Sequence, residues 1–135
     1  MKKMVTLPVI LIVCMSLCAL FPVSALAETM EVSKSAVCEN VVNREVVSEG
    51  SSFSASVGKL YCYSKIANIQ SHTEVVHAWY FGDAQRARVT LNVNPPAWRT
   101  YSSKVIQDHE IGNWRVEILD PSGNLLETVR FDITQ

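Results

Sequence analysis

The sequence has few of the residues from which common catalytic and cofactor-binding motifs are built. Its 135 residues include 5 glycines, and no glycine-rich loop precedes a helix, which argues against a phosphate-binding loop. Ser102 and Ser103 do not stand in the Gly-x-Ser-x-Gly pattern of a nucleophile elbow. The sequence after residue 27 has no run of basic residues that could bind nucleic acid or an anionic membrane. We therefore expect no cofactor and no nucleic-acid partner. A hydrolase is a distant third possibility, after a binding module and a structural or assembly module.

Metal ligands are also scarce. His72 and His77 lie five residues apart, a spacing that places them on opposite faces of a strand, so they cannot chelate one ion together. The run Asp108-His109-Glu110 is better explained as a polar loop than as a cation site. We expect no metal centre.

The amino-terminal segment has the pattern of a secretory signal peptide. Lys2 and Lys3 precede an apolar run from Val5 to Val23, and Ala25-Leu26-Ala27 matches a small-x-small cleavage site. A membrane anchor and a lipidated Cys18 are the alternatives; a membrane-spanning helix usually lacks such a cleavage site. We predict cleavage after Ala27, export, and no stable membrane insertion afterwards.

Cleavage changes both the charge and the cysteine content. It leaves 108 of the 135 residues, and basic residues fall from 12 to 10 against 13 acidic ones, so the net charge changes from −1 to −3. Cys38 and Cys62 remain. An even number of cysteines in an exported chain predicts a disulfide. By the loop-closure model, such a bridge would raise the free energy of unfolding by about 3 to 4 kcal/mol. Two buried free thiols are the alternative, and two cysteines supply only half of a tetrahedral zinc shell.

A hairpin between Gly112 and Ile133 is the clearest structural signal. Apolar and charged residues alternate from Trp114 to Ile118, as expected for a half-buried strand. Asp120-Pro121-Ser122-Gly123 supplies the turn. The return strand is irregular at its start, which predicts a bulge near Leu126.

The rest of the chain reads as further short strands without a convincing helix. We predict a flexible leader at 28–35 and one domain at 36–135, with a surface loop at 48–56 anchored by Phe53. The strands expected before the hairpin are 37–47, 59–69, 73–81, 86–94 and 98–106. Both faces of 73–81 are apolar, which suits a central strand in which His77 and Trp79 are core residues. Seven strands predict an immunoglobulin-like two-sheet sandwich, with a small β-barrel as the alternative.

The segment from Trp98 to Lys104 is the exception, because neither of its faces is apolar enough for an ordinary core strand. An edge strand explains this pattern, since solvated edges are often polar. A recognition surface explains it too, because Arg and Tyr dominate binding energy at interfaces. We take Trp98, Arg99, Tyr101 and Lys104 as the candidate recognition residues, with Arg99 and Tyr101 on one face.

The chain resembles a bacterial family known only as a domain of unknown function, number twenty-nine fourteen. The similarity rests on Trp98-Arg99-Thr100-Tyr101-Ser102-Ser103-Lys104, on Gly112-Asn113-Trp114-Arg115-Val116 with the Asp120 to Gly123 turn, and on His77-Ala78-Trp79 and Asn43-Arg44-Glu45. The resemblance implies a compact β-domain of cell-envelope proteins and implies no known activity. It adds no catalytic residue.

Two functions therefore stay open. The favoured one is a non-enzymatic module in the periplasm or cell envelope that binds a protein or a cell-wall glycan. The alternative is a structural or assembly module without a ligand of its own.

Overall fold

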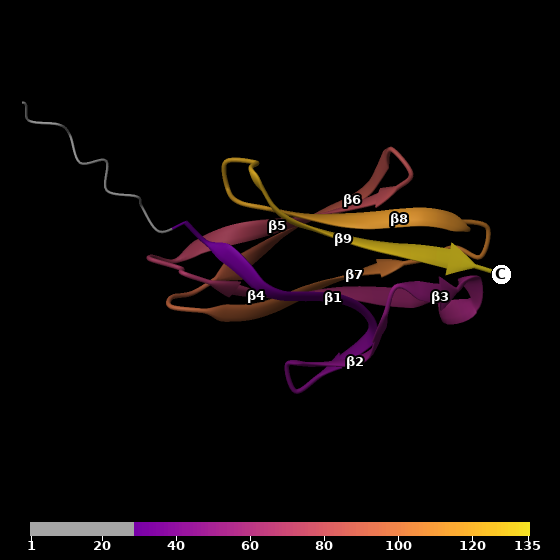
Figure 1. The fold of residues 1–135 in the computed structure, drawn as a ribbon, viewed down its shortest axis with the longest axis horizontal. Coiled ribbons are helices and arrows are strands. Elements are labelled where there is room, and N and C mark those ends of the chain that lie inside the picture. The colour runs from indigo at the N-terminus through magenta and orange to yellow at the C-terminus, as the bar shows by residue number, and fades with distance from the viewer. Residues whose placement is uncertain (1–28) are drawn as a thin grey trace, which may run out of the picture.

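Two mainly antiparallel β-sheets stack on each other (Figure 1). The structure is a computed structural model that describes residues 29–135. One sheet has four strands in the order β2-β1-β4-β7, and the other has five in the order β3-β9-β8-β5-β6. Neither sheet closes on itself, so the predicted two-sheet sandwich is confirmed and the barrel alternative is wrong. The predicted signal peptide and its cleavage site lie outside the described residues.

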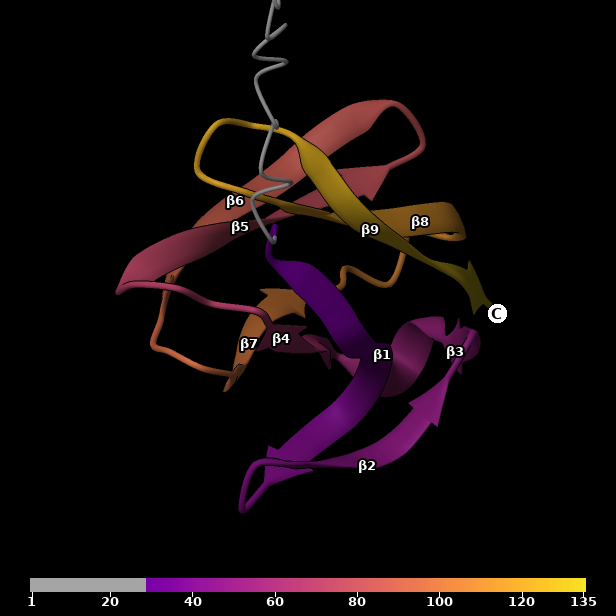
Figure 2. The same ribbon diagram turned by 60° about the vertical axis from the view of Figure 1, so that its left-hand side comes forward.

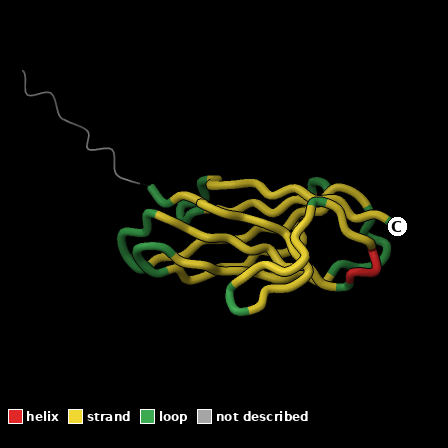
Figure 3. The backbone as a smooth tube through the Cα atoms, turned by 60° about the horizontal axis from the view of Figure 1, so that its bottom comes forward, coloured by secondary structure: helices red, strands yellow, loops and turns green. Residues whose placement is uncertain are grey.

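Nine strands build the sandwich, two more than predicted. Their bounds are β1 Glu31–Val42, β2 Glu45–Gly50, β3 Ser52–Ser54, β4 Lys59–Ala67, β5 Thr73–Phe81, β6 Ala84–Val93, β7 Trp98–Val105, β8 Gly112–Leu119 and β9 Leu125–Thr134. A single 3₁₀ turn, Ala55–Val57, is the helical segment of the described part, drawn red in Figure 3.

The amino-terminal strands differ most from the prediction. Segment 37–47, predicted as one strand, is instead a hairpin whose turn is Asn43-Arg44, both with positive φ (51° and 62°). Valines on both sides conceal this turn, which contains neither Gly nor Pro. The leader predicted for 28–35 is also wrong in part, because β1 begins at Glu31 and pairs with β4 from there.

The β8–β9 hairpin matches its prediction closely. The Asp120 carboxylate accepts hydrogen bonds from the backbone amides of Ser122 and Asn124, and Gly123 takes a φ of 87°. A hydrogen bond from the Asn124 side chain is the largest cause that lowers the pKa of Asp120, and these backbone hydrogen bonds act in the same direction. Leu119 pairs with Leu125 although Ile118 pairs with Glu127, which confirms the bulge at Leu126.

Aromatic residues fill the space between the sheets. Trp114 stacks on Phe131 with ring centroids 5.9 Å apart, and Trp79 meets Phe131 edge-on at 6.1 Å. Phe53 approaches the same ring at 6.2 Å and is buried, so it anchors its segment as predicted. The surface loop predicted for 48–56 is wrong, because this segment contains the end of β2, all of β3 and the start of the 3₁₀ turn. Both tryptophans lie on central strands, β5 and β8, of the five-stranded sheet.

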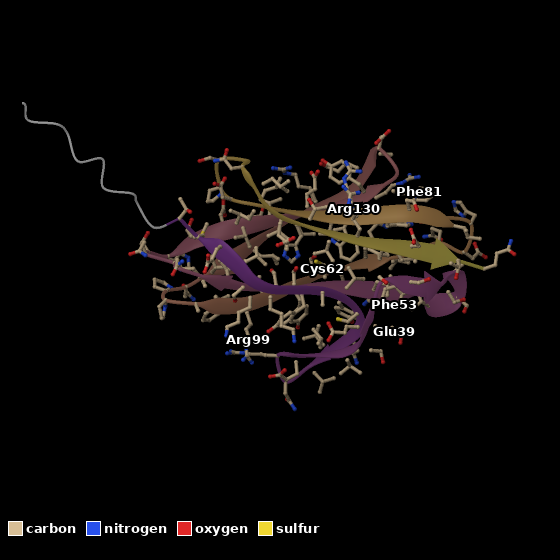
Figure 4. The ribbon with its side chains drawn as sticks, in the orientation of Figure 1. Glu39, Phe53, Cys62, Phe81, Arg99 and Arg130 are labelled. Atoms are coloured by element: carbon tan, nitrogen blue, oxygen red, sulfur yellow. The ribbon has the colours of Figure 1, made fainter. Side chains whose placement is uncertain are left out.

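The predicted disulfide between Cys38 and Cys62 is not formed, and both cysteines are buried free thiols. Cys62 pairs with Val37 across β1 and β4, whereas Cys38 pairs with Tyr61. Cross-strand partners share a face and neighbours along a strand alternate, so the two thiols point to opposite faces of the sheet. Figure 4 places Cys62 between the two sheets.

The β1–β2 hairpin leaves the plane of its sheet. Figure 2 shows it curving beneath β4 and β7, although β2 and β7 are opposite edges of the four-stranded sheet. Arg44 and Glu45 at its tip contact Trp98 and Arg99 at the start of β7. The outer face of this sheet is therefore partly covered by its own chain.

Candidate binding surface

Most exposed apolar side chains gather on the outer face of the four-stranded sheet. Six large hydrophobic residues within 29–135 are exposed, and alternation along the strands places four of them on this face: Val42, Val47, Tyr101 and Val105. The register adds Tyr61 and the basic residues Lys34, Lys65 and Arg99 to the same face. We call these eight residues the tyrosine face.

Two tyrosine rings form its centre. Tyr61 and Tyr101 lie on neighbouring strands with ring centroids 5.9 Å apart and an interplanar angle of 64°, an edge-to-face contact. Tyr101 is 48% exposed. The Lys59 ammonium lies 5.7 Å from the Tyr61 ring centroid, within cation–π range. These rings present stacking surface and hydroxyl groups to solvent.

Three cations cross the face in one row. Lys34 pairs with Lys65 across β1 and β4, and Lys65 pairs with Arg99 across β4 and β7. Like charges placed directly opposite each other destabilise a sheet. Glu45 offsets part of this repulsion, because one of its oxygens accepts a hydrogen bond at 3.1 Å from Arg99 Nη1.

The hairpin tip shapes the border of the face. The Arg44 guanidinium lies 5.7 Å from the Trp98 ring centroid, and Tyr63, which pairs with Tyr101, is only 3% exposed. Burial raises the pKa of the Tyr63 hydroxyl, while Arg99 acts in the opposite direction. Tyr63 is therefore covered, whereas Tyr101 beside it remains accessible.

The structure divides the four predicted recognition residues between two faces. Arg99 and Tyr101 share the outer face as expected, but Trp98 and Lys104 belong to the alternate face of β7. Trp98 packs against a core cluster that contains Ile66, and Lys104 Nζ donates to the Val105 carbonyl at 2.8 Å. Strand β7 is an edge of its sheet, which confirms the edge-strand interpretation. The aromatic ring next to Arg99 on the outer face is thus Tyr101, which in turn contacts Tyr61, and not Trp98.

Only some residues of the tyrosine face could be predicted from the sequence. Tyr61 and Lys65 share one face of their strand by simple alternation, but no local sequence pattern indicates that β7 lies beside this strand. Val42 and Val47 could not be placed, because the hairpin turn between them was missed.

The combination of serine and histidine that could suggest catalysis is sealed inside the sandwich. His77 Nε2 lies 2.9 Å from Ser64 Oγ, His77 Nδ1 lies 2.7 Å from Ser102 Oγ, and Trp79 Nε1 donates to Ser102 Oγ at 3.0 Å. His77 is 0% exposed, and burial lowers its pKa to about 4. The ring is therefore neutral at pH 7 and connects the two sheets, as expected for a core histidine.

The loop at 108–110 does not gather metal ligands. Glu110 is buried and its carboxylate accepts a hydrogen bond from the Gln107 amide at 2.9 Å, whereas the Asp108 and His109 side chains are 96% and 78% exposed. Within residues 29–135, no three His, Cys, Asp or Glu side chains cluster as a metal site would require. The same part of the chain holds no helix of the length and apolarity needed to cross a bilayer.

Two stacked sheets without an α-helix in residues 29–135 place the protein in the class of two-sheet β-sandwiches. Residues 72–133 match a family described as "Protein of unknown function (DUF2914)", which confirms the predicted resemblance to that family. The matched region runs from the residue before β5 almost to the end of β9 and includes Arg99 and Tyr101.

A solved structure of a β-glucosidase, EmGH1 from Erythrobacter marinus, is similar in fold, with a TM-score of 0.52 and 11% sequence identity. The similarity covers 78% of this chain but 15% of that enzyme's chain, so it concerns the fold alone. No curated protein matches the chain.

Proposed function

We propose that the protein is a non-enzymatic binding module of the bacterial cell envelope, and that the tyrosine face binds its partner, a protein or a cell-wall glycan. The observation that carries this proposal is the gathering of four of the six exposed large apolar side chains on one face. Scattered apolar residues are ordinary on protein surfaces, whereas a grouped set bordered by charge indicates an interaction site.

The chemistry of the face suits recognition better than reaction. Tyr61 and Tyr101 offer ring surface for stacking on sugar or side chains, and Arg99 offers a planar set of hydrogen-bond donors. The serine and histidine that could support hydrolysis lie in the interior, where a substrate has no path to them.

Arg99 has a native partner that a ligand would have to compete with. Its contact with Glu45 joins side chains that are 41% and 66% exposed, and such surface ion pairs contribute about 0 to 1 kcal/mol. A carboxylate or a polar ligand can displace Glu45 at small cost. The assembly-module alternative requires no ligand at this position.

The experiment compares the unaltered domain, residues 28–135, with the double variant Arg99→Ala plus Tyr101→Ala. Each is immobilised and exposed to envelope extract and to purified cell-wall sacculi. Loss of capture is expected, with stability within about 1 kcal/mol of the unaltered domain. The matched control is Arg88→Ala plus Leu125→Ala, which removes an exposed arginine and an exposed apolar residue from the other sheet.

Two results would contradict the proposal. Equal capture by the double variant would exclude the tyrosine face as the binding site. Unfolding of the double variant would show that Arg99 and Tyr101 are structural, which favours the assembly-module alternative.

A further inference from the structure

A shallow depression lies on the outer face of the five-stranded sheet, away from the tyrosine face. Its volume is about 200 Å³, and it is lined by Gly82, Asp83, Asn113, Trp114, Arg115 and Arg130. Figure 4 shows Arg130 and Arg99 on opposite sides of the sandwich. The depression shares no residue with the tyrosine face, so what it binds is independent of the function proposed above.

Two arginines of this depression are direct neighbours. Arg115 on β8 pairs with Arg130 on β9, and alternation puts both side chains on the outer face. Opposed like charges are unfavourable in a sheet, as in the row of cations on the tyrosine face. An anion placed between the two guanidinium groups would turn this repulsion into attraction.

Arg115 is held in place before any ligand arrives. Its guanidinium lies 4.2 Å from the Tyr80 ring centroid, its Nη1 donates to the Gly82 carbonyl at 2.7 Å, and its Nε lies 3.4 Å from Glu117 Oε1. The side chain is 22% exposed. Arg115 therefore supplies a fixed guanidinium group at the wall of the depression, its charge partly offset by Glu117, and little further ordering is required on binding.

Arg130 differs from Arg115 in having no such contacts. It is exposed, and no acidic side chain in the described part of the chain forms an ion pair with it. Its planar set of donors matches the two oxygens of a carboxylate or a phosphate.

The charges of the lining distinguish between those two anions. Asp83 in the lining and Glu117, which pairs with Arg115 beside it, together offset most of the charge of Arg115 and Arg130, so the net charge at the depression lies between about 0 and +1. That value suits a singly charged group better than a doubly charged one. We propose that this depression binds a carboxylate group, with Arg130 as its principal ligand and Arg115 as a fixed neighbouring charge.

The test is an NMR titration of the mature domain with sodium acetate, N-acetylalanine and glucuronate, which each carry one carboxylate, against sodium chloride and sodium phosphate at matched ionic strength. Saturable shifts are expected for the amides of Gly82, Asn113, Arg115 and Arg130 with the carboxylates. Tighter binding of N-acetylalanine than of glucuronate would favour the carboxylate of an amino acid or peptide, and the reverse order would favour that of a sugar acid.

Substitutions then locate the binding group. Arg130→Gln should weaken carboxylate binding by about tenfold or more, because a charge-assisted hydrogen bond is worth roughly 1.5 to 3 kcal/mol. Arg88→Gln, which removes the same charge from an exposed position on β6, should change affinity by less than about twofold. The Arg99→Ala, Tyr101→Ala double variant should bind carboxylate as the unaltered domain does.

Three outcomes would overturn the proposal. Equal chemical-shift changes with chloride would show that the response to carboxylates is only ionic screening. Unchanged carboxylate affinity in Arg130→Gln would exclude the Arg130 guanidinium as the binding group. Tighter binding of phosphate than of acetate would contradict the assignment to a singly charged group. A melting curve for each variant confirms that it is folded before its affinity is compared.

Discussion

His77 Nδ1 lies 2.7 Å from Ser102 Oγ, which joins a central strand of one sheet to the edge strand of the other through the interior. The second ring nitrogen of His77 meets Ser64, and Trp79 shares the Ser102 oxygen. All four residues are at most 5% exposed. Buried polar groups of this kind stabilise a fold only when every member has its partner.

We predict that Ser102→Ala destabilises the domain by about 1 to 3 kcal/mol, because it leaves the Trp79 Nε1 hydrogen and a nitrogen of His77 without a buried partner. Urea denaturation measures the loss. Ser103→Ala removes the same hydroxyl one residue away at an exposed position and should change stability by no more than about 0.5 kcal/mol. Equal effects of the two substitutions would contradict the role of the network.

We predict that His77 makes the domain acid-sensitive. In the unfolded chain a histidine binds a proton near pH 6.5, whereas burial holds the pKa of folded His77 at about 4. Between these values the unfolded state binds more protons, so stability falls as pH falls from about 6.5 toward 4. The loss between about pH 7.5 and about pH 4.5 is roughly 2 to 3 kcal/mol from this residue.

Urea denaturation at both pH values, with His77→Gln beside the unaltered domain, isolates that contribution from the titration of carboxylates. The variant should lose less stability on acidification, although it starts lower. His109→Gln is the control, since the His109 side chain is 78% exposed. An identical pH dependence in all three proteins would show that His77 titrates normally.

We predict two thiols that react only after unfolding. Burial is the main cause that raises the pKa of both Cys38 and Cys62, and neither is exposed. Iodoacetamide without a reductant should label the native domain slowly and the denatured domain twice, as counted by mass spectrometry. Reductant should leave the melting temperature unchanged. An unlabelled denatured chain with a mass lower by two hydrogens would instead show a disulfide, which requires β1 to slip by one residue.

We predict that the mature protein begins at Glu28, because Ala25-Leu26-Ala27 fits the cleavage specificity of secretory signal peptides. Amino-terminal sequencing of the exported protein decides this. An intact Met1, or a lipid-modified Cys18, would be incompatible with the prediction.

Local patterns predicted the strands well where turn residues are explicit. The Asp120 to Gly123 turn and the bulge at Leu126 were visible because Pro, Gly and a break in alternation are local signals. The Asn43-Arg44 turn was invisible, since both residues take positive φ without a glycine and the valines around them suit a strand on either side. That missed turn accounts for one of the two additional strands.

The candidate surface was predictable only in part, because it depends on which strands become neighbours. Alternation correctly placed Arg99 and Tyr101 on one face of β7, yet it could not show that Tyr61 would lie beside Tyr101. The same limit explains the disulfide error. Two cysteines in sequence do not reveal a register that offsets them by one residue on adjacent strands.

The last ten residues in strand form, β9, lie inside the five-stranded sheet between β3 and β8. β3 pairs with β9 in parallel, with Ser52 opposite Asp132, although the two residues are 80 positions apart in the chain. The five-stranded sheet therefore stays open between β3 and β8 until β9 docks. Until β9 pairs with its neighbours, Phe53 and Trp114 have no Phe131 to cover them. Uncovered aromatic rings and unpaired strand edges favour aggregation, so the docking of β9 is the folding step on which the solubility of this domain depends.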